Sequence, residues 1–432
     1  MRIGLYLQDQ NYPSNSEYTS LIASVKDSDI DLLVFPEACY TPNIEDFRTR
    51  SVEYSPDLEE CRNLCLKMSQ DFGRAIIYSG EDRFNTLFSI FANPVAREVE
   101  TKTKVYIKHT ATDNSAFDFR DYGQLIDTQF EPMIFRGYKL GMTICYDSNH
   151  ALFSRAYGLN GADIIINSTG GNIVRTKWHR YQKVRAMENR CFTFCTMGFE
   201  GNYNSINSYT FGFTPGGKLM GAFPLFKQGI SKGSISNVYV YDTDCDINES
   251  EPDIGLDQRE TLNKHWHFDI TPAVFDSIVA SSIKVGNNLY VKSLEDKSLV
   301  LAILDKDSIY RPESVSNTLY DERLKQYMNK RYLIVNIWDQ IDIREFQNKL
   351  SDVLKVRSME NYCAVLLLSQ DYVRCYQCGK NRTAQVLKLV DEKYALDLSR
   401  MGGPETIWRD TPGMMEAHWR KGYELLLKRL IR

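Results

Sequence analysis

The stretch KLGMTICYD, residues 139–147, decides the fold of the first half of this 432-residue chain. Its apolar residues form a short run that stops at Cys145, which is typical of a buried strand. In α/β folds, ligand sites form beyond the carboxyl ends of such strands. We therefore expect a buried strand that delivers the Cys145 thiol into a loop.

Two other apolar runs stop at a reactive side chain. Residues 31–37 (DLLVFPE) end at the carboxylate of Glu37, and residues 104–108 (KVYIK) end at the amine of Lys108. Both runs are short enough for buried strands. The pattern predicts one site in which strand ends bring together a thiol, a carboxylate and an amine.

These motifs occur in the order FPE at 35–37, YIKH at 106–109 and GMTICYD at 141–147. In that order they resemble the nitrilase or carbon–nitrogen hydrolase superfamily. Shorter stretches agree with the resemblance: NTL at 85–87, RAMEN at 185–189 and GGKL at 216–219. The resemblance covers residues 1–245. It implies an αββα two-sheet sandwich and a homo-oligomer.

The three residues suit a cysteine-dependent amidase that needs no cofactor and no metal. A free thiol is only a few per cent thiolate at neutral pH, so Cys145 needs a base, and Glu37 is the expected one. A positive donor such as Lys108, aimed at a developing oxyanion, is worth roughly 3–4 kcal/mol. The backbone N–H of Tyr146 is the expected second donor. The expected substrate is a small-molecule amide, cleaved through a Cys145 thioester with release of ammonia or an amine.

Two departures from the family keep other functions open. The family's second glutamate, between its lysine and its cysteine, has no direct counterpart, and Asp127 lies nearest that point. Where many members carry an arginine after the cysteine, this chain has Asn149. By likeness to the family, Asn167, Ser168 and Thr169 should line the far wall of the pocket. The alternatives are a ligand-binding or regulatory module that has lost turnover, and an acyl or amide-nitrogen transferase.

Composition limits the class of protein and of partner. The formal charge is −4, from 52 Lys and Arg against 56 Asp and Glu, which argues against nucleic acid or an anionic membrane. No apolar run is long enough for a membrane span, and the start does not fit a signal peptide. The ten cysteines are scattered through apolar contexts. We therefore expect a cytoplasmic protein with reduced thiols.

The chain is long enough for two to three domains. We expect a nitrilase-like domain at 1–245, a linker and extension at 246–290, and a smaller C-terminal α/β domain of no recognised family at 291–432. The last of these has apolar runs typical of buried strands and of helices. The expected strands span 298–303, 332–337 and 363–368, and the expected helices span 343–354 and 386–390.

Other sequence features favour structural roles. Arg185 and Glu188 are three residues apart on a predicted helix, which indicates a structural ion pair rather than catalytic groups. Trp178, on the same helix, is expected in the core. Cys375 and Cys378 form one Cys-x-x-Cys pair, but a zinc site needs four ligands, so neither zinc binding nor redox chemistry is expected there.

Overall fold

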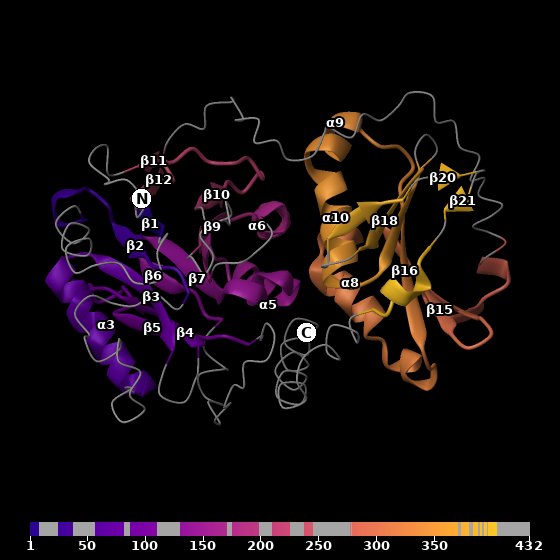
Figure 1. Cartoon of the computed structure of the whole chain (residues 1–432), viewed down its shortest axis with the longest axis horizontal. Coiled ribbons are helices and arrows are strands. Elements are labelled where there is room, and N and C mark those ends of the chain that lie inside the picture. The colour runs from indigo at the N-terminus through magenta and orange to yellow at the C-terminus, as the bar shows by residue number, and fades with distance from the viewer. Residues whose placement is uncertain are drawn as a thin grey trace, which may run out of the picture. The chain divides into compact units, whose positions relative to one another are not determined.

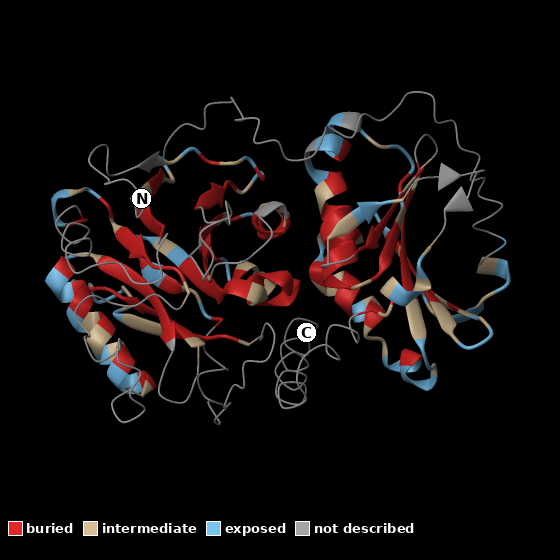
Figure 2. Cartoon of the chain, in the orientation of Figure 1, coloured by how far each residue is buried: buried red, intermediate tan, exposed pale blue. Residues whose placement is uncertain are grey.

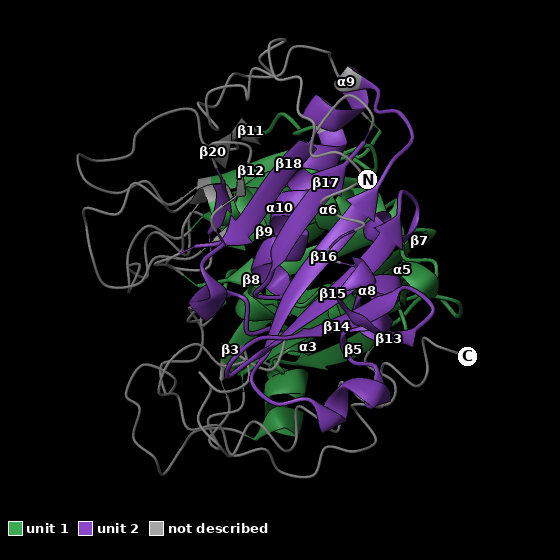
Figure 3. Cartoon of the chain, turned by 90° about the vertical axis from the view of Figure 1, so that its right-hand side faces the viewer, with its two compact units in different colours: residues 1–252, 417–422 green, residues 253–416, 423–432 purple. Residues whose placement is uncertain are grey.

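The computed structural model divides the chain into two compact units, coloured separately in Figure 3. The described residues up to 244 belong to the first unit, and those from 277 to the second. Figure 1 labels their helices and strands. The structure describes residues 1–7, 25–37, 57–81, 87–109, 130–170, 175–197, 210–224, 237–244, 277, 279–369, 373–379, 383–387, 389–390, 393–394 and 396–403.

Within the described part of the first unit, seven strands form one mixed sheet in the order β11-β12-β1-β2-β3-β4-β5. Strands β1, β2 and β3 are parallel, and β4 is antiparallel to both β3 and β5. Consequently β2 and β5 run in the same direction and end at the same edge. The strands are β1 (Arg2–Leu7), β2 (Leu32–Val34), β3 (Ala75–Glu81), β4 (Leu87–Ala92), β5 (Thr103–Ile107), β11 (Phe223–Pro224) and β12 (Asn237–Asp242).

A second sheet of the same unit, which we call the Cys145 sheet, has the order β10-β9-β8-β7-β6 among the described residues. Strands β7, β8 and β9 are parallel, and the outer strands β6 and β10 are antiparallel to their neighbours. Its strands are β6 (Met133–Phe135), β7 (Tyr138–Ile144), β8 (Ile164–Thr169), β9 (Phe192–Met197) and β10 (Phe211–Phe213).

Helices cover the outer faces of both sheets. Helix α3 packs on β3, β4 and β5, whereas α5 packs on β7, and α6 packs on β9 and β10. Between the layers, β1 meets β9, and β7 meets β4 and β5, and Figure 2 shows buried residues along these strands. The expected αββα sandwich is confirmed. The helices are α3 (Leu58–Phe72), α5 (Ala151–Leu159) and α6 (Arg175–Asn189).

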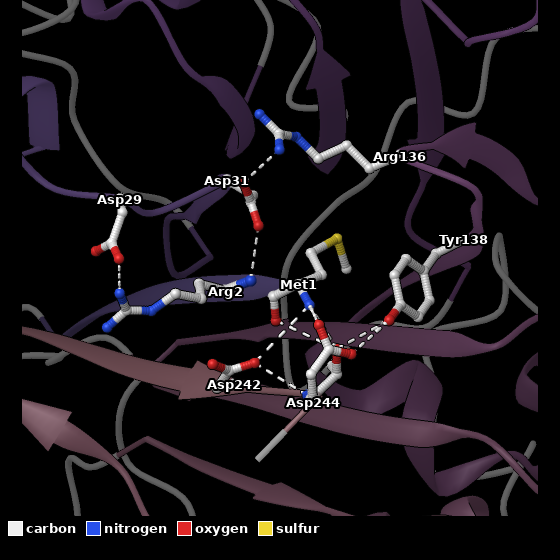
Figure 4. A network of polar contacts seen from close by, with 9 residues as sticks. Met1, Arg2, Asp29, Asp31, Arg136, Tyr138, Asp242 and Asp244 are labelled. Carbon is white, nitrogen blue, oxygen red and sulfur yellow. Dashed lines mark hydrogen bonds and ion pairs between the residues drawn. The ribbon is translucent and has the colours of Figure 1, made fainter.

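A polar network ties the two sheets at the amino end of β7 (Figure 4). The α-ammonium group of Met1 donates to Thr243 Oγ1 at 2.9 Å and to Asp244 Oδ2 at 2.6 Å. The phenol of Tyr138, the first residue of β7, donates to the other carboxylate oxygen of Asp244 at 2.9 Å. The β1–β12 pair and the start of β7 are thereby held together. The opposite, carboxyl end of β7 leads to Cys145.

The second unit holds another mixed sheet, of seven strands within the described residues, in the order β13-β14-β15-β16-β17-β18-β19. Among these described strands, only β15, β16 and β17 are parallel to one another. Helix α8 packs on β15, and α10 packs on β17, β18 and β19. The strands are β13 (Ile283–Gly286), β14 (Leu289–Ser293), β15 (Ser298–Asp305), β16 (Lys330–Ile337), β17 (Ala364–Leu368), β18 (Val373–Cys378) and β19 (Ala384–Val386). The helices are α8 (Pro312–Leu319), α9 (Ile343–Glu345), a π turn (Phe346–Leu350) and α10 (Ser351–Glu360).

In the range 246–290, expected as a linker and extension, β13 and the first residues of β14 pair in the sheet of the second unit. One expectation for this part of the chain is wrong. The range 386–390 is not a helix: Val386 ends β19, and Leu389–Val390 forms strand β20. Short apolar runs suit either structure, and here partner strands decided the outcome. The expected strands at 298–303, 332–337 and 363–368 are confirmed.

Candidate functional site

Three strand ends bring Glu37, Lys108 and Cys145 together. Glu37 follows β2, Lys108 follows β5 directly, and Cys145 follows β7 directly. The Lys108 ammonium lies 2.7 Å from Glu37 Oε1, with side chains only 3% and 10% exposed. The backbone N–H of Gly170, just beyond β8, donates to Glu37 Oε2 at 2.9 Å. Both oxygens of the Glu37 carboxylate are therefore oriented by the fold.

Cys145 has an unusual backbone conformation. Its φ is 42°, in the left-handed region that side chains other than glycine rarely adopt. It opens a tight 3₁₀ turn, Cys145–Asn149, immediately after the strand. Such a conformation costs of order 1–3 kcal/mol and persists only where neighbouring contacts enforce it. The fold thus sets the direction of this thiol at an energetic cost.

The charges of the site act on one another. Burial, and then the negative charge of Glu37, hold the pKa of the Cys145 thiol well above its ordinary value, although Lys108 opposes this. Burial lowers the pKa of Lys108, but the charge and hydrogen bond of Glu37, together with the charges of Cys145 and Asp147, outweigh burial, so that pKa is raised. At neutral pH the site therefore holds a neutral thiol and an ammonium group. Cys145 needs a base before it can attack a carbonyl group.

Asp147 is a buried carboxylate whose position the sequence analysis did not use. Its Oδ2 accepts a 2.8 Å hydrogen bond from the Tyr106 phenol. Both of its oxygens lie 3.2 Å from the backbone nitrogen of His109, which donates to them. These donors flank Lys108, so Asp147 joins the turn at Cys145 to the end of β5. Its place within the GMTICYD motif was the only signal in the sequence.

The polar side chains at the end of β8 hold neighbouring chain segments. Ser168 Oγ donates to the carbonyl of Phe35 at 3.0 Å, which joins this strand to the segment that carries Glu37. Asn167 Nδ2 donates to Thr143 Oγ1 at 3.0 Å and to the carbonyl of Cys145 at 3.4 Å. The hydroxyl of Thr169 accepts a bond from the indole N–H of the buried Trp178 at 3.1 Å.

Asn149 differs from these residues. It is 4% exposed, yet neither its amide nitrogen nor its amide oxygen has a hydrogen-bond partner in the described structure. A buried amide left in this state costs about 1–3 kcal/mol. Tyr146 lies three residues earlier in the same 3₁₀ turn, where positions three apart share a face. Asp127, the remaining residue expected at the site, lies outside the described residues.

Positive charge gathers near the turn that Cys145 begins. Lys177 is buried, and its ammonium lies 6.0 Å from the centre of the Tyr146 ring. Burial, aided by Arg185 and by other positive side chains, lowers the pKa of His150 to about 3. His150 is therefore neutral at physiological pH. Lys177 carries no signal in the sequence, because one lysine in a basic helix is unremarkable there.

The predicted ion pair between Arg185 and Glu188 is confirmed. The two charged groups lie 2.7 Å apart, and both side chains are almost fully buried. Arg185 Nε also donates to the carbonyl of Ser148 at 3.1 Å. The pair therefore supports the turn that Cys145 begins, as well as its own helix.

No metal centre is found in the described residues: no group of three or more His, Cys, Asp or Glu side chains there could hold an ion. Cys375 and Cys378 are both buried in β18. Because they are three positions apart on a strand, they point to opposite faces of the sheet. Within the described residues, no helix is long and apolar enough to span a membrane.

Comparison with known proteins finds a family match for the first part of the chain. The family profile described as Carbon-nitrogen hydrolase matches residues 10–243. Among solved structures, a carbon–nitrogen hydrolase from Helicobacter pylori G27 is 16% identical, with a TM-score of 0.40, over 56% of this chain and 88% of that one. An amidase from Nesterenkonia sp. is 17% identical, with a TM-score of 0.41, over 56% of this chain and 89% of that one. No curated protein gives a significant match.

Proposed function

The chain belongs to the carbon–nitrogen hydrolase family, and from this premise we propose that it is a cysteine-dependent amidase acting on a small amide. One observation carries the proposal: Glu37 binds the buried Lys108 at 2.7 Å, and its negative charge helps to raise the pKa of the buried Cys145 thiol. A base, a fixed positive charge and a nucleophile are the groups that acyl transfer needs.

In the proposed first step, Glu37 takes the proton of Cys145 as the sulfur attacks the amide carbon. The carbonyl electron pair moves to oxygen and forms a tetrahedral oxyanion. The Lys108 ammonium and the backbone N–H of Tyr146 stabilise this oxyanion. Glu37 then gives its proton to the leaving nitrogen, the carbon–nitrogen bond breaks, and an acyl thioester remains on Cys145.

In the second step, a water molecule gives a proton to Glu37 and attacks the thioester. The carbon–sulfur bond breaks, the carboxylic acid leaves, and the proton returns to Cys145. In both steps the negative charge moves from the Glu37 carboxylate to the oxyanion while Lys108 remains positive. The partner of Lys108 therefore changes just as the oxyanion forms, which favours the transition state over the ground state.

Intact-protein mass spectrometry with a panel of small amides tests the proposal. An acyl adduct that clears with release of ammonia or amine and of acid supports the amidase. Cys145→Ala should form no adduct, whereas Cys191→Ala, which removes another buried thiol, should still form one. No adduct across the panel would favour the ligand-binding module, and transfer of the acyl group to an added amine would favour the transferase.

We also propose that the protein is cytoplasmic, because its cysteines are scattered through apolar contexts, and that it forms a homo-oligomer, as the family resemblance implies. We propose domains at 1–245 and from the start of β13 onward, because β13 pairs in the sheet of the second unit. Light scattering during size-exclusion chromatography tests the oligomer directly. A single mass equal to one chain at micromolar concentration would contradict it.

A further inference from the structure

A nine-residue stretch occurs twice in the chain. Residues 183–191 read KVRAMENRC, and residues 355–363 read KVRSMENYC, with seven of nine positions identical. The first copy ends α6 and leads into β9, and the second ends α10 and leads into β17. Each copy thus closes a helix that precedes a buried parallel strand.

The two copies make the same contacts. Arg357 lies 2.6 Å from Glu360, as Arg185 lies 2.7 Å from Glu188, and both arginines are fully buried. The amide of Asn361 donates to the carbonyl of Arg357 at 3.0 Å, and the amide of Asn189 donates to that of Arg185 at 2.9 Å.

The ends of the two helices also match. Arg190 and Tyr362 occupy equivalent positions, and both have positive φ, 54° and 47°. The backbone N–H groups of Cys191 and Cys363 donate to the carbonyl groups five residues before them, each at 3.1 Å.

The similarity extends over a whole layer of the fold. The Cys145 sheet has the order β10-β9-β8-β7-β6, and five strands of the second unit have the order β18-β17-β16-β15-β14. Three parallel strands stand at the centre of each set, with one antiparallel strand on either side. Helices α5 and α6 connect the parallel strands of the first set, and α8 and α10 connect those of the second.

Asparagines show that the two sheets match residue by residue. Asn167 in β8 stands opposite Thr143 and Cys195. Asn336 in β16 stands opposite Leu304 in β15 and Leu367 in β17. When the alignment of the repeated stretch is continued into the following strand, Leu367 aligns with Cys195. The amide of Asn336 donates to the carbonyl groups at the end of β15, at 3.1 and 2.9 Å.

The match of Thr143 with Leu304 can be continued along the two chain segments, and this identifies the residue that corresponds to Cys145. If Thr143 matches Leu304, then Cys145 matches Lys306 and Ser148 matches Ile309. The arginines support this independently, because Arg185 Nε donates to the Ser148 carbonyl and Arg357 Nε donates to the Ile309 carbonyl.

We infer that the second unit is a structural repeat of the Cys145 sheet with its helices, in which Lys306 stands where the first unit has its nucleophile. Its side chain has no thiol, and its backbone does not adopt the positive φ of Cys145. The repeat therefore retains the scaffold of the Cys145 sheet without its nucleophile.

The repeat also distinguishes residues of the first unit that support the fold from residues that belong to the reactive site. The Asn167 amide and the Arg185–Glu188 pair have counterparts in a copy without a nucleophile, so they hold the fold rather than the substrate. Asp147 and Asn149 correspond to Ser308 and Tyr310, so the buried acid and the buried amide belong only to the reactive copy.

Hydrogen exchange of the full chain tests the repeat. Glu188→Gln and Glu360→Gln each leave a buried arginine without its charge partner. We expect Glu188→Gln to raise exchange rates in residues 138–197, and Glu360→Gln to raise them in residues 298–378, by at least about tenfold each. The control is Lys325→Gln, which removes an exposed ion pair and should leave exchange within about twofold of wild type. Unchanged exchange in Glu360→Gln would overturn the repeat.

Mapping of the acyl adduct tests the lost chemistry and rests on the proposed function. We expect one adduct per chain, on Cys145. An adduct mapped to residues 283–403 would overturn the inference that the second unit lacks a nucleophile. If no adduct forms anywhere, the proposed amidase fails, but the exchange experiment still decides whether the repeat is real.

Discussion

The phenol of Tyr106 donates a 2.8 Å hydrogen bond to Oδ2 of Asp147. Tyr106 stands two residues before Lys108, and Asp147 stands two residues after Cys145. The same carboxylate accepts the backbone N–H of His109. A buried acid therefore fixes the distance between the end of β5 and the turn that holds the thiol.

The first prediction concerns Asp147 as a positioning residue. Asp147→Asn replaces an acceptor by a donor and leaves a buried N–H unsatisfied, so we expect the free energy of unfolding to fall by about 1–3 kcal/mol. Because Lys108 shifts with its neighbours, kcat should fall while KM changes little. Urea unfolding and steady-state kinetics measure the two effects. Tyr106→Phe, which removes one bond, should have the smaller effect on both, and an unchanged kcat in Asp147→Asn would mean that the acid is structural only.

The second prediction concerns the charge pair of the site. Glu37→Gln removes the proposed base, and we expect kcat to fall by roughly 10²–10⁴-fold. It also removes the main charge that raises the pKa of Lys108, while the burial that lowers this pKa remains. Lys108 is positive below its pKa, so residual activity in Glu37→Gln should disappear at a lower alkaline pH than activity in the wild type. A pH profile of kcat/KM measures this, and identical alkaline limbs would contradict it.

The third prediction concerns the reactivity of the thiol. Since its pKa is raised, Cys145 stays protonated well above pH 7, and its reactive thiolate grows about tenfold for each unit of pH. Alkylation by iodoacetamide, followed by peptide mass spectrometry, should therefore accelerate from pH 6 to pH 9. Lys108 lowers this pKa, so Lys108→Met should slow alkylation at every pH. A rate that is flat across this range would reveal a preformed thiolate.

The fourth prediction concerns His150 and stability in acid. With its pKa lowered to about 3, the folded protein keeps His150 neutral, whereas the unfolded chain binds a proton near the ordinary value of 6.5. The free energy of unfolding is therefore highest with respect to His150 above pH 6.5. It falls from there toward pH 3, by up to about 1.4 kcal/mol per pH unit. His150→Gln removes this dependence. Urea unfolding between pH 7.5 and 5 compares the two slopes, and parallel slopes would show that His150 does not titrate on unfolding.

The fifth prediction concerns Asn149, whose buried amide has no partner in the described structure. Asn149→Leu removes an unsatisfied group, so we expect unchanged or higher stability. If the amide binds substrate, KM should rise by about tenfold or more. Asn167→Leu is the matched control, because it breaks hydrogen bonds that are made and should lower stability by about 1–3 kcal/mol. A loss of stability in Asn149→Leu with unchanged KM would assign Asn149 to the fold.

Much of the candidate site could be predicted because its signals are local. A short apolar run that stops at Glu37, Lys108 or Cys145 is visible within six or seven residues of sequence. The same reasoning located the strands of the second unit. It failed at 386–390, where too few residues distinguish a helix from a strand.

The sequence by itself determined the three strand ends and the Arg185–Glu188 pair, because each depends on periodicity or on spacing within a few residues. The sandwich class of the first unit followed from the resemblance of the motifs to the family. The tertiary structure decided that Asp147 accepts hydrogen bonds from Tyr106 and His109, on either side of Lys108 in the sequence. It also decided that Gly170 orients Glu37. These contacts join residues that are 38 and 133 positions apart. It also extended the repeated nine-residue stretch to the whole Cys145 sheet, because strand order and register preserve a fold after most side chains have changed.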